Sequence, residues 1–365
     1  MIFLKSFNKW LRIMVFLPIP IVMALVNYIV DPANIFHDYA QNIVNSMVAG
    51  NNTWILSGNV NERKVKQLLI EKMPNEVDCI AIGPSLIMGV RDSDAGEKIF
   101  YNLGESAADY YDILAQFGML DAKGTKYKRV ILCVDTYFFD ENMYKSGSRN
   151  KAFKLWSDYM LGILDGKQLP VPINDNKNNL MSYEEWKNLF SVAYLQQSFN
   201  AIKEIGRLDA YIGDRWGVVD DLNTEAYYRP DGSYVYSKKY QTKGVEFTRE
   251  HAQSYNIQKQ FAKGVHLKTK EKETFEKLIQ YLLNRNIAVE LYLCPVAPSL
   301  WDRINDNNEY PSIPELEEFA HSMSQKYSLK ITGSYNPYKL HMTDEDFYDC
   351  RHVRHELLSK YFDFN

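Results

Sequence analysis

Three residue types that could act as nucleophile, base and orienting acid occur at two distant points of the chain. Ser85 closes the tripeptide Gly83-Pro84-Ser85, directly after an apolar run. Asp349 and His352 stand three positions apart near the C-terminus. A serine on a sharp turn exposes its hydroxyl, a histidine can take the proton, and a carboxylate can hold the imidazole in the required tautomer. The combination predicts serine-dependent acyl transfer or ester hydrolysis.

Each half of this combination also has a purely structural interpretation. Gly-Pro-Ser is a common turn in which the serine caps the next helix, and on the tripeptide alone that interpretation is favoured. In isolation, Asp349 as an N-cap and His352 as a surface residue fit equally well. Cys350 lies between them and is expected to be a packing residue, because sequence neighbours point apart and only Arg351 could lower its pKa. The case for chemistry therefore depends on all three residues meeting.

Metal, cofactor and disulfide chemistry have little support in the sequence. His341, His352 and His355 lack carboxylates at metal-ligand spacing, so neither a metal nor a cofactor is predicted. The cysteines do not have the pattern of a disulfide framework. Three of them lie inside apolar runs, where a thiol packs as a small hydrophobe: Cys79, Cys133 and Cys294.

Short apolar runs alternate with segments of helical periodicity along most of the chain. Strands are expected at residues 77–82, 98–103, 129–134, 287–294 and 329–332. Helices are expected at residues 61–73, 105–121, 183–205, 270–284 and 314–327, with a last one after Asp349. This alternation predicts a three-layer α/β fold around a central parallel sheet of flavodoxin-like order, with ligands bound beyond the carboxyl ends of the strands. Residues 137–266, rich in Tyr, Asn, Lys and Trp, are interpreted as a long insertion.

The N-terminus has the pattern of a single membrane anchor. Residues 13–30 are uncharged and largely apolar, which approaches the length of a bilayer crossing. The basic residues before them predict a cytoplasmic N-terminus and an extracytoplasmic remainder, and no small-residue cleavage site follows. We therefore expect a cytoplasmic stub and transmembrane helix (1–30), a juxtamembrane segment with the first helix (31–76), and a catalytic domain (77–361). A buried or interfacial helix is the alternative.

Composition narrows the range of partners. The chain of 365 residues carries a net charge of −4, and its part after the basic N-terminus is more acidic still, so nucleic acid is not an expected partner. Aromatic residues make up 14%, and Tyr and Trp offer flat apolar faces with a polar handle. Four tryptophans could line a glycan groove or simply pack the insertion and its surroundings: Trp156, Trp186, Trp216 and Trp301.

The order of these motifs resembles the SGNH (GDSL-like) hydrolase superfamily. The resemblance rests on Gly83-x-Ser85 after the first strand, a glycine after the second, and Asp349-x-x-His352 at the end. It implies an oxyanion hole formed by the N–H groups of Ser85 and Gly104, the latter within Asn102-Leu103-Gly104-Glu105. Members of the superfamily have an asparagine in a third motif, which follows the third strand, whereas this chain reads Asp135-Thr136-Tyr137-Phe138 there. That departure leaves the third oxyanion donor open, with Thr136 as one candidate.

Within the superfamily the chain looks similar to membrane-anchored, extracytoplasmic members that acylate polysaccharides, such as the D-alanyl transfer protein of teichoic acids and the alginate acetylation proteins. The likeness includes Asp31-Pro32-Ala33-Asn34-Ile35-Phe36 after the anchor and spans most of residues 77–361. It implies O-acetylation of a cell-envelope or secreted polysaccharide beside a membrane-bound O-acyltransferase partner. A polysaccharide O-acetylesterase is one alternative, and a non-catalytic glycan-binding or scaffold subunit is another.

Overall fold

The computed structural model describes residues 17–33, 35–56, 60–139, 148–172, 183–206, 209–261, 263–305 and 309–364. Its centre is a five-stranded sheet in which all neighbouring strands are parallel. The spatial order is β3 (Phe100–Asn102), β2 (Glu76–Ile82), β4 (Lys126–Cys133), β8 (Ala288–Leu293), β9 (Lys330–Gly333). Counted along the chain this is roughly the 2-1-3-4-5 order of flavodoxin-like sheets. The predicted α/β class and central parallel sheet are confirmed.

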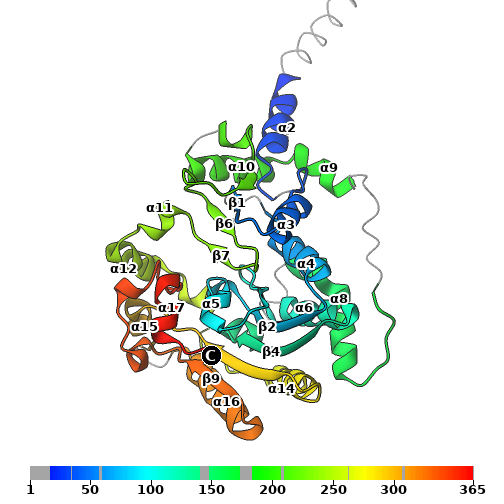
Figure 1. Cartoon of the computed structure of the whole chain (residues 1–365). Coiled ribbons are helices and arrows are strands. Elements are labelled where there is room, and N and C mark those ends of the chain that lie inside the picture. The colour runs from blue at the N-terminus through cyan, green and yellow to red at the C-terminus, as the bar shows by residue number, and fades with distance from the viewer. Residues whose placement is uncertain are drawn as a thin grey trace, which may run out of the picture.

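Helices between the strands cover the sheet (Figure 1). Those predicted from periodicity are α4 (Glu62–Lys72), α6 (Tyr110–Lys123), α14 (Thr269–Leu283) and α16 (Ser312–Tyr327). Local sequence explains their ends: the Asp109 side chain accepts from the N–H groups of Tyr111 and Asp112 at the start of α6, and Gly124 ends that helix in the left-handed conformation. The other helices outside the insertion are α3 (Ala40–Val48), α5 (Asp92–Ala95), α15 (Pro298–Asn305) and α17 (Leu358–Tyr361).

The insertion contributes a second, antiparallel sheet that the sequence pattern does not indicate. Its order is β5 (Trp216–Val218), β1 (Thr53–Ile55), β6 (Ala226–Tyr228), β7 (Tyr234–Val235). Strands of two or three residues are too short for alternation to be recognised in a sequence. Since β1 precedes the predicted catalytic domain, this sheet joins the juxtamembrane segment to the insertion.

The remaining helices belong to the insertion. Residues 183–205 form two helices, α9 (Tyr183–Leu189) and α10 (Val192–Ile205), and not the single one expected. The break lies at Ser191, whose hydroxyl accepts from the Tyr194 N–H and caps α10. The others are α8 (Ser148–Leu164), which packs on α6, and the short helices α11 (Lys238–Gln241), α12 (Val245–Ser254) and α13 (Ile257–Gln260).

The N-terminal apolar run is described from residue 17 onward, as helix α2 (Pro18–Val30). No helix in the described part of the chain has both the length and the apolar character needed to cross a membrane. Residues 13–16 of the predicted span, and the basic residues before them, lie outside the described residues.

Candidate active site

Ser85 lies immediately beyond the carboxyl end of β2, in the short 3₁₀ helix Ser85–Ile87. The turn brings the chain unusually close to the neighbouring strand, because a Cβ on Gly83 would lie 2.6 Å from the Cβ of Cys133. Glycine is therefore required at that position, and Ser85 follows as a half-exposed residue at the sheet edge. This is the edge at which ligands of parallel α/β sheets bind.

The structure brings Ser85, His352 and Asp349 together in one hydrogen-bonded relay. The Ser85 Oγ lies 2.9 Å from the His352 Nε2. The His352 Nδ1 lies 2.9 Å from the Asp349 Oδ2 and 3.1 Å from the Oδ1. A carboxylate can only accept, so the Nδ1–H donates to Asp349 and the Nε2 is left to accept the serine proton. Serine, imidazole and carboxylate thus have the geometry of a nucleophile, a base and an orienting acid.

Asp349 is held in its ionised form. Burial alone would raise the pKa of Asp349, but the facing His352 and hydrogen bonds from His352, Tyr240 and the Arg351 N–H hold it well below its usual range. The Arg351 and His352 N–H groups both donate to the Asp349 Oδ1, at 2.7 and 2.8 Å. A fixed negative charge behind the imidazole favours the imidazolium that forms when the serine gives up its proton.

The insertion supplies two tyrosines to this relay. The Tyr240 hydroxyl donates to the Asp349 Oδ2, and burial together with the Asp349 charge raises the pKa of that hydroxyl. The Tyr236 ring lies edge-on to His352, with centroids 5.7 Å apart, and stacks on Tyr240 at 4.9 Å. Neither residue was predicted from the sequence. Tyr236 precedes the Ser237 cap of α11 and Tyr240 lies within that helix, so no helical spacing links them.

A buried ion pair fixes the loop that carries the relay. The Arg351 guanidinium donates to the Asp135 Oδ2 at 2.8 Å, and both side chains are almost fully buried. Asp135 stands beyond the end of β4, so the pair joins that strand to the turn containing Asp349 and His352. No regular helix begins directly after Asp349. The chain instead makes a turn, and α17 starts only at Leu358.

The predicted oxyanion donors are only partly available. The Ser85 N–H opens its 3₁₀ helix and has no acceptor among the described residues. The Gly104 N–H, in contrast, donates to the Asn102 Oδ1 at 2.8 Å. Asn102 also donates to the carbonyls of Ile87 and Val90, at 2.7 and 2.8 Å. Asn102 therefore joins the segment Asn102-Leu103-Gly104-Glu105 to the serine turn. Its side chain also accepts from the Gly104 N–H, which the resemblance assigns to the oxyanion hole.

Thr136 begins the short 3₁₀ helix Thr136–Phe139 beyond the end of β4, and its side chain contacts its own neighbour. Its hydroxyl donates to the Asp135 Oδ1 at 3.0 Å, so this proton is used within the Asp135–Arg351 pair. Gly104 itself is tightly enclosed, since a Cβ there would come within 2.8 Å of the Ile87 Cγ2. The structure thus places Gly104 beside the serine turn and keeps the Thr136 hydroxyl engaged elsewhere.

Cys350 lies beside the relay without taking part in it. Burial and the neighbouring Asp349 charge raise the pKa of this thiol to about 12, and its Sγ lies 3.3 Å from the His251 Nδ1. A thiol kept protonated is a poor nucleophile. Within the described part of the chain, no three His, Cys, Asp or Glu side chains gather as they would around a metal ion.

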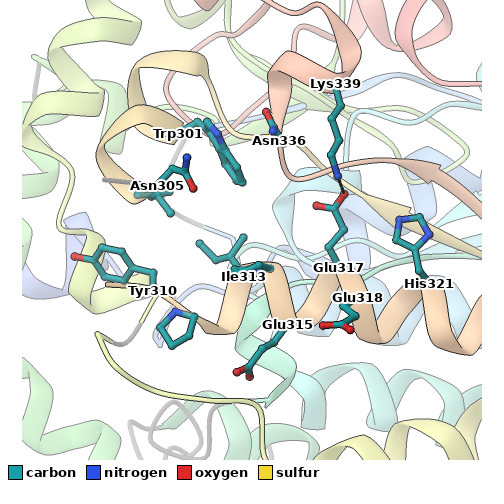
Figure 2. Close-up of a pocket in the computed structure, with 13 residues that line it drawn as sticks. Trp301, Asn305, Tyr310, Ile313, Glu315, Glu317, Glu318, His321, Asn336 and Lys339 are labelled. Carbon is teal, nitrogen blue, oxygen red and sulfur yellow. Dashed lines mark hydrogen bonds and ion pairs between the residues drawn. The ribbon is translucent and has the colours of Figure 1, made fainter. Parts of the chain in front are cut away.

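A large cavity lies at another place, between α15 and α16 (Figure 2). Its volume is about 710 Å³, and Trp301 and Tyr310 contribute aromatic surface. Glu317 pairs with Lys339 at 2.7 Å on the opposite side. A smaller cavity shares Trp301 with it and is also lined by Arg351. Of the four tryptophans considered for glycan binding, Trp301 is the one that lines this cavity.

No protein-family model matches the chain, and no significant match exists among curated proteins. The SGNH assignment therefore continues to rest on the motifs and their order.

Proposed function

We propose that this protein is an SGNH-type serine acyltransferase or esterase that acts outside the cytoplasm, in the O-acetylation of a cell-envelope or secreted polysaccharide. The observation that carries the proposal is the continuous relay from the Ser85 hydroxyl through His352 to Asp349. These residues come from opposite ends of the chain. Their meeting at a sheet edge, with the required donors and acceptors, favours chemistry over two unrelated turns.

The first half-reaction transfers the acyl group to the serine. His352 Nε2 takes the proton as the Ser85 Oγ bonds to the ester carbonyl carbon. The tetrahedral adduct collapses by breaking its bond to the alcohol oxygen, which takes the proton back from His352. In the second half-reaction His352 activates a sugar hydroxyl or water, and the acyl–serine bond breaks. The products are an acylated sugar or a free acid, and Ser85 regains its proton.

The developing oxyanion needs hydrogen-bond donors. The Ser85 N–H can donate without rearrangement, and a donor of this kind contributes about 3 kcal/mol to the transition state. The Gly104 N–H can contribute only by turning from Asn102 or by sharing its proton between two acceptors. We place both N–H groups in the oxyanion hole, with Gly104 recruited when substrate binds. Thr136 is not needed in this scheme.

A glycan acceptor is supported by the cavity beside Trp301. An indole face can stack on the apolar face of a sugar ring, while the carboxamides and carboxylates around it can bind hydroxyl groups. Asn305, Asn336 and Glu318 provide such groups (Figure 2). We also propose a membrane-bound O-acyltransferase as the partner that supplies the acyl group.

Labelling with a fluorophosphonate probe tests the proposal directly. The full chain in detergent should be labelled once, at Ser85, and Ser85→Ala should abolish labelling. Ser322→Ala is a matched control, because Ser322 lies exposed on α16 and bonds only within its own helix. The absence of labelling in folded wild-type protein would contradict the proposal. Incubation of labelled acetyl ester with and without an oligosaccharide then separates transfer to sugar from release of acetate.

A non-catalytic glycan-binding or scaffold subunit is the second candidate. The observation that favours it is the engagement of the Gly104 N–H by Asn102, together with the absence of an asparagine in the third motif. A scaffold would bind oligosaccharide through the Trp301 groove and would do so equally well after Ser85→Ala. It would show no reaction with the probe. Oligosaccharide binding by both proteins, without labelling of either, identifies this outcome.

A further inference from the structure

An unusual amount of large apolar surface lies uncovered where α2 leaves the body of the protein. The apolar side chains of α2 are exposed on several sides, among them Ile19, Val22 and Leu25. Around its base, α9, α10 and the adjoining turn expose further large residues. We call these the apolar collar: Trp186, Phe190, Val192, Phe199 and Ile212.

The spacing of the collar residues along the sequence places those at α9 and α10 on the outward side of these helices. Trp186 and Phe190 are four positions apart, and Val192 and Phe199 are seven apart, so each pair lies on one face. Phe199 is 56% exposed and Ile212 is 72% exposed. A cluster of exposed large apolar side chains, unlike a single one, marks a surface that contacts something else. The inward face of α10, toward α2, carries the polar Tyr194 and Ser198 beside the apolar Ala201 and Ile202.

That inward face fixes the collar to α2. The buried Asn27 amide donates to the carbonyls of Asn188, Leu189 and Ser191, at 3.0 to 3.2 Å. The Ser198 hydroxyl donates to the Asn27 Oδ1 at 3.2 Å. A buried amide that satisfies carbonyls from the end of α9 and the start of α10 makes a rigid junction. The collar and the lower end of α2 therefore move together.

Asp31 strengthens the junction from the other side. Its carboxylate accepts from the N–H groups of Ile35, Phe36 and His37, each at 2.8 Å, and from the Tyr194 hydroxyl of α10 at 2.7 Å. Arg215 reaches the last carbonyls of α2, at Ile29 and Val30. These polar contacts hold the end of α2 in place, and α9 and α10 lie on either side of that helix (Figure 1).

We infer that the apolar collar is seated in the membrane, at the boundary between headgroups and acyl chains. The uncharged run 13–30 ends at Val30, and a bilayer crossing requires about 20 apolar residues. The end of this run, where the collar is fixed, therefore coincides with the headgroup region. Trp and Phe are favoured at that depth. The collar then holds the body at a set orientation to the lipid surface, independently of any chemistry at Ser85.

A lipid surface is favoured over a protein partner because the exposed apolar residues continue from the collar along α2, which carries no charged side chain. Six further apolar side chains lie on α2 and its cap, all exposed: Leu17, Ile19, Ile21, Val22, Leu25 and Tyr28. Protein interfaces have a polar border around their apolar centre. A bilayer accepts continuous apolar surface on all sides of an entering helix.

Quenching by brominated lipid tests the inference with the full chain. The protein is reconstituted into phosphatidylcholine–phosphatidylglycerol vesicles with and without brominated acyl chains. The emission contributed by Trp186, measured as wild type minus Trp186→Phe, should be largely lost in brominated vesicles. The emission contributed by Trp301, measured with Trp301→Phe, should be retained because Trp301 lies at the α15–α16 cavity. Unquenched Trp186 emission overturns the inference.

Thiol labelling provides an independent measurement that needs no tryptophan change. All native cysteines are buried, so Phe199→Cys introduces one accessible thiol. In lipid vesicles a charged, membrane-impermeant maleimide should modify it much more slowly than Leu155→Cys, a matched exposed position on α8. Equal rates for the two variants in vesicles would mean that lipid does not cover the collar and would overturn the inference.

Discussion

The Tyr240 hydroxyl offers the sharpest test of how the relay is built. Tyr240→Phe keeps the ring and removes the side-chain hydrogen bond that Tyr240 donates to Asp349. A hydrogen bond to a charged group is worth about 1.5–3 kcal/mol. Asp349 retains the two N–H donors of its own loop and the His352 ring, so we assign about 1 kcal/mol of this to the transition state. That corresponds to a roughly fivefold loss of rate.

The assay is the second-order rate constant for fluorophosphonate labelling of Ser85, which needs no knowledge of the natural substrate. Tyr236→Phe is the matched control, because the Tyr236 hydroxyl has no hydrogen bond to any described residue while its ring still faces His352. We expect Tyr236→Phe to react at the wild-type rate. Thermal unfolding of each variant separates a lost hydrogen bond from a lost fold.

Two results would refute the reasoning. The first is a Tyr240→Phe variant that reacts as fast as wild type while Asp349→Asn is slow, which would show that the tyrosine hydroxyl does not act through the carboxylate. The second is an equal loss of rate in Tyr236→Phe, which would point to aromatic packing as the cause.

Three further predictions concern residues outside the relay. Burial raises the pKa of Glu105 to about 8, so between the ordinary glutamate pKa and that value the folded chain binds more protons than the unfolded chain. The free energy of unfolding should therefore fall as pH rises through this window, by up to about 1.4 kcal/mol per pH unit. Glu105→Gln should flatten this slope in urea titrations from pH 5 to 8. Gly104→Ala should cost about 1–3 kcal/mol of folding stability because the new Cβ meets the Ile87 side chain. Gly244→Ala, with open space around it, should change the stability little. Equal effects of the two substitutions in chemical denaturation would contradict this packing argument. Trp301→Ala should weaken oligosaccharide binding in calorimetry without altering labelling of Ser85, and unchanged binding would remove the groove as the acceptor site.

The central sheet was predictable because its strands carry local signals. β2 and β4 end in continuous apolar runs that are buried in the sheet, and such runs stand out against amphipathic helices. The relay was predictable for the same reason, since each half is a short motif next to a strand or near the C-terminus. What joined the halves was the topology, which brings the ends of parallel strands to one edge.

The contacts that complete the site depend on segments far apart in sequence, and no local pattern reports them. Tyr240 reaches Asp349 across 109 positions, and β1 finds its partners in the insertion. The role of Asn102 is different. An asparagine whose side chain accepts from the N–H two residues later is a recognisable turn, so the Asn102-x-Gly104 spacing did contain the information that this N–H is engaged.

The small antiparallel sheet links the end of α2 to the relay. Arg215 contacts the last carbonyls of α2 and directly precedes β5, which pairs with β1 and, through it, with β6 and β7. β7 leads to Tyr236 and Tyr240, and its Tyr234 N–H donates to the Met88 carbonyl beside the serine turn at 2.8 Å. Short, hydrogen-bonded strands therefore connect the end of α2 with the residues around Asp349 and Ser85. A fragment that begins at residue 77 would lack β1, leaving β5 and β6 without the strand between them, and we expect it to lose the Tyr240 contribution even where the central sheet still forms.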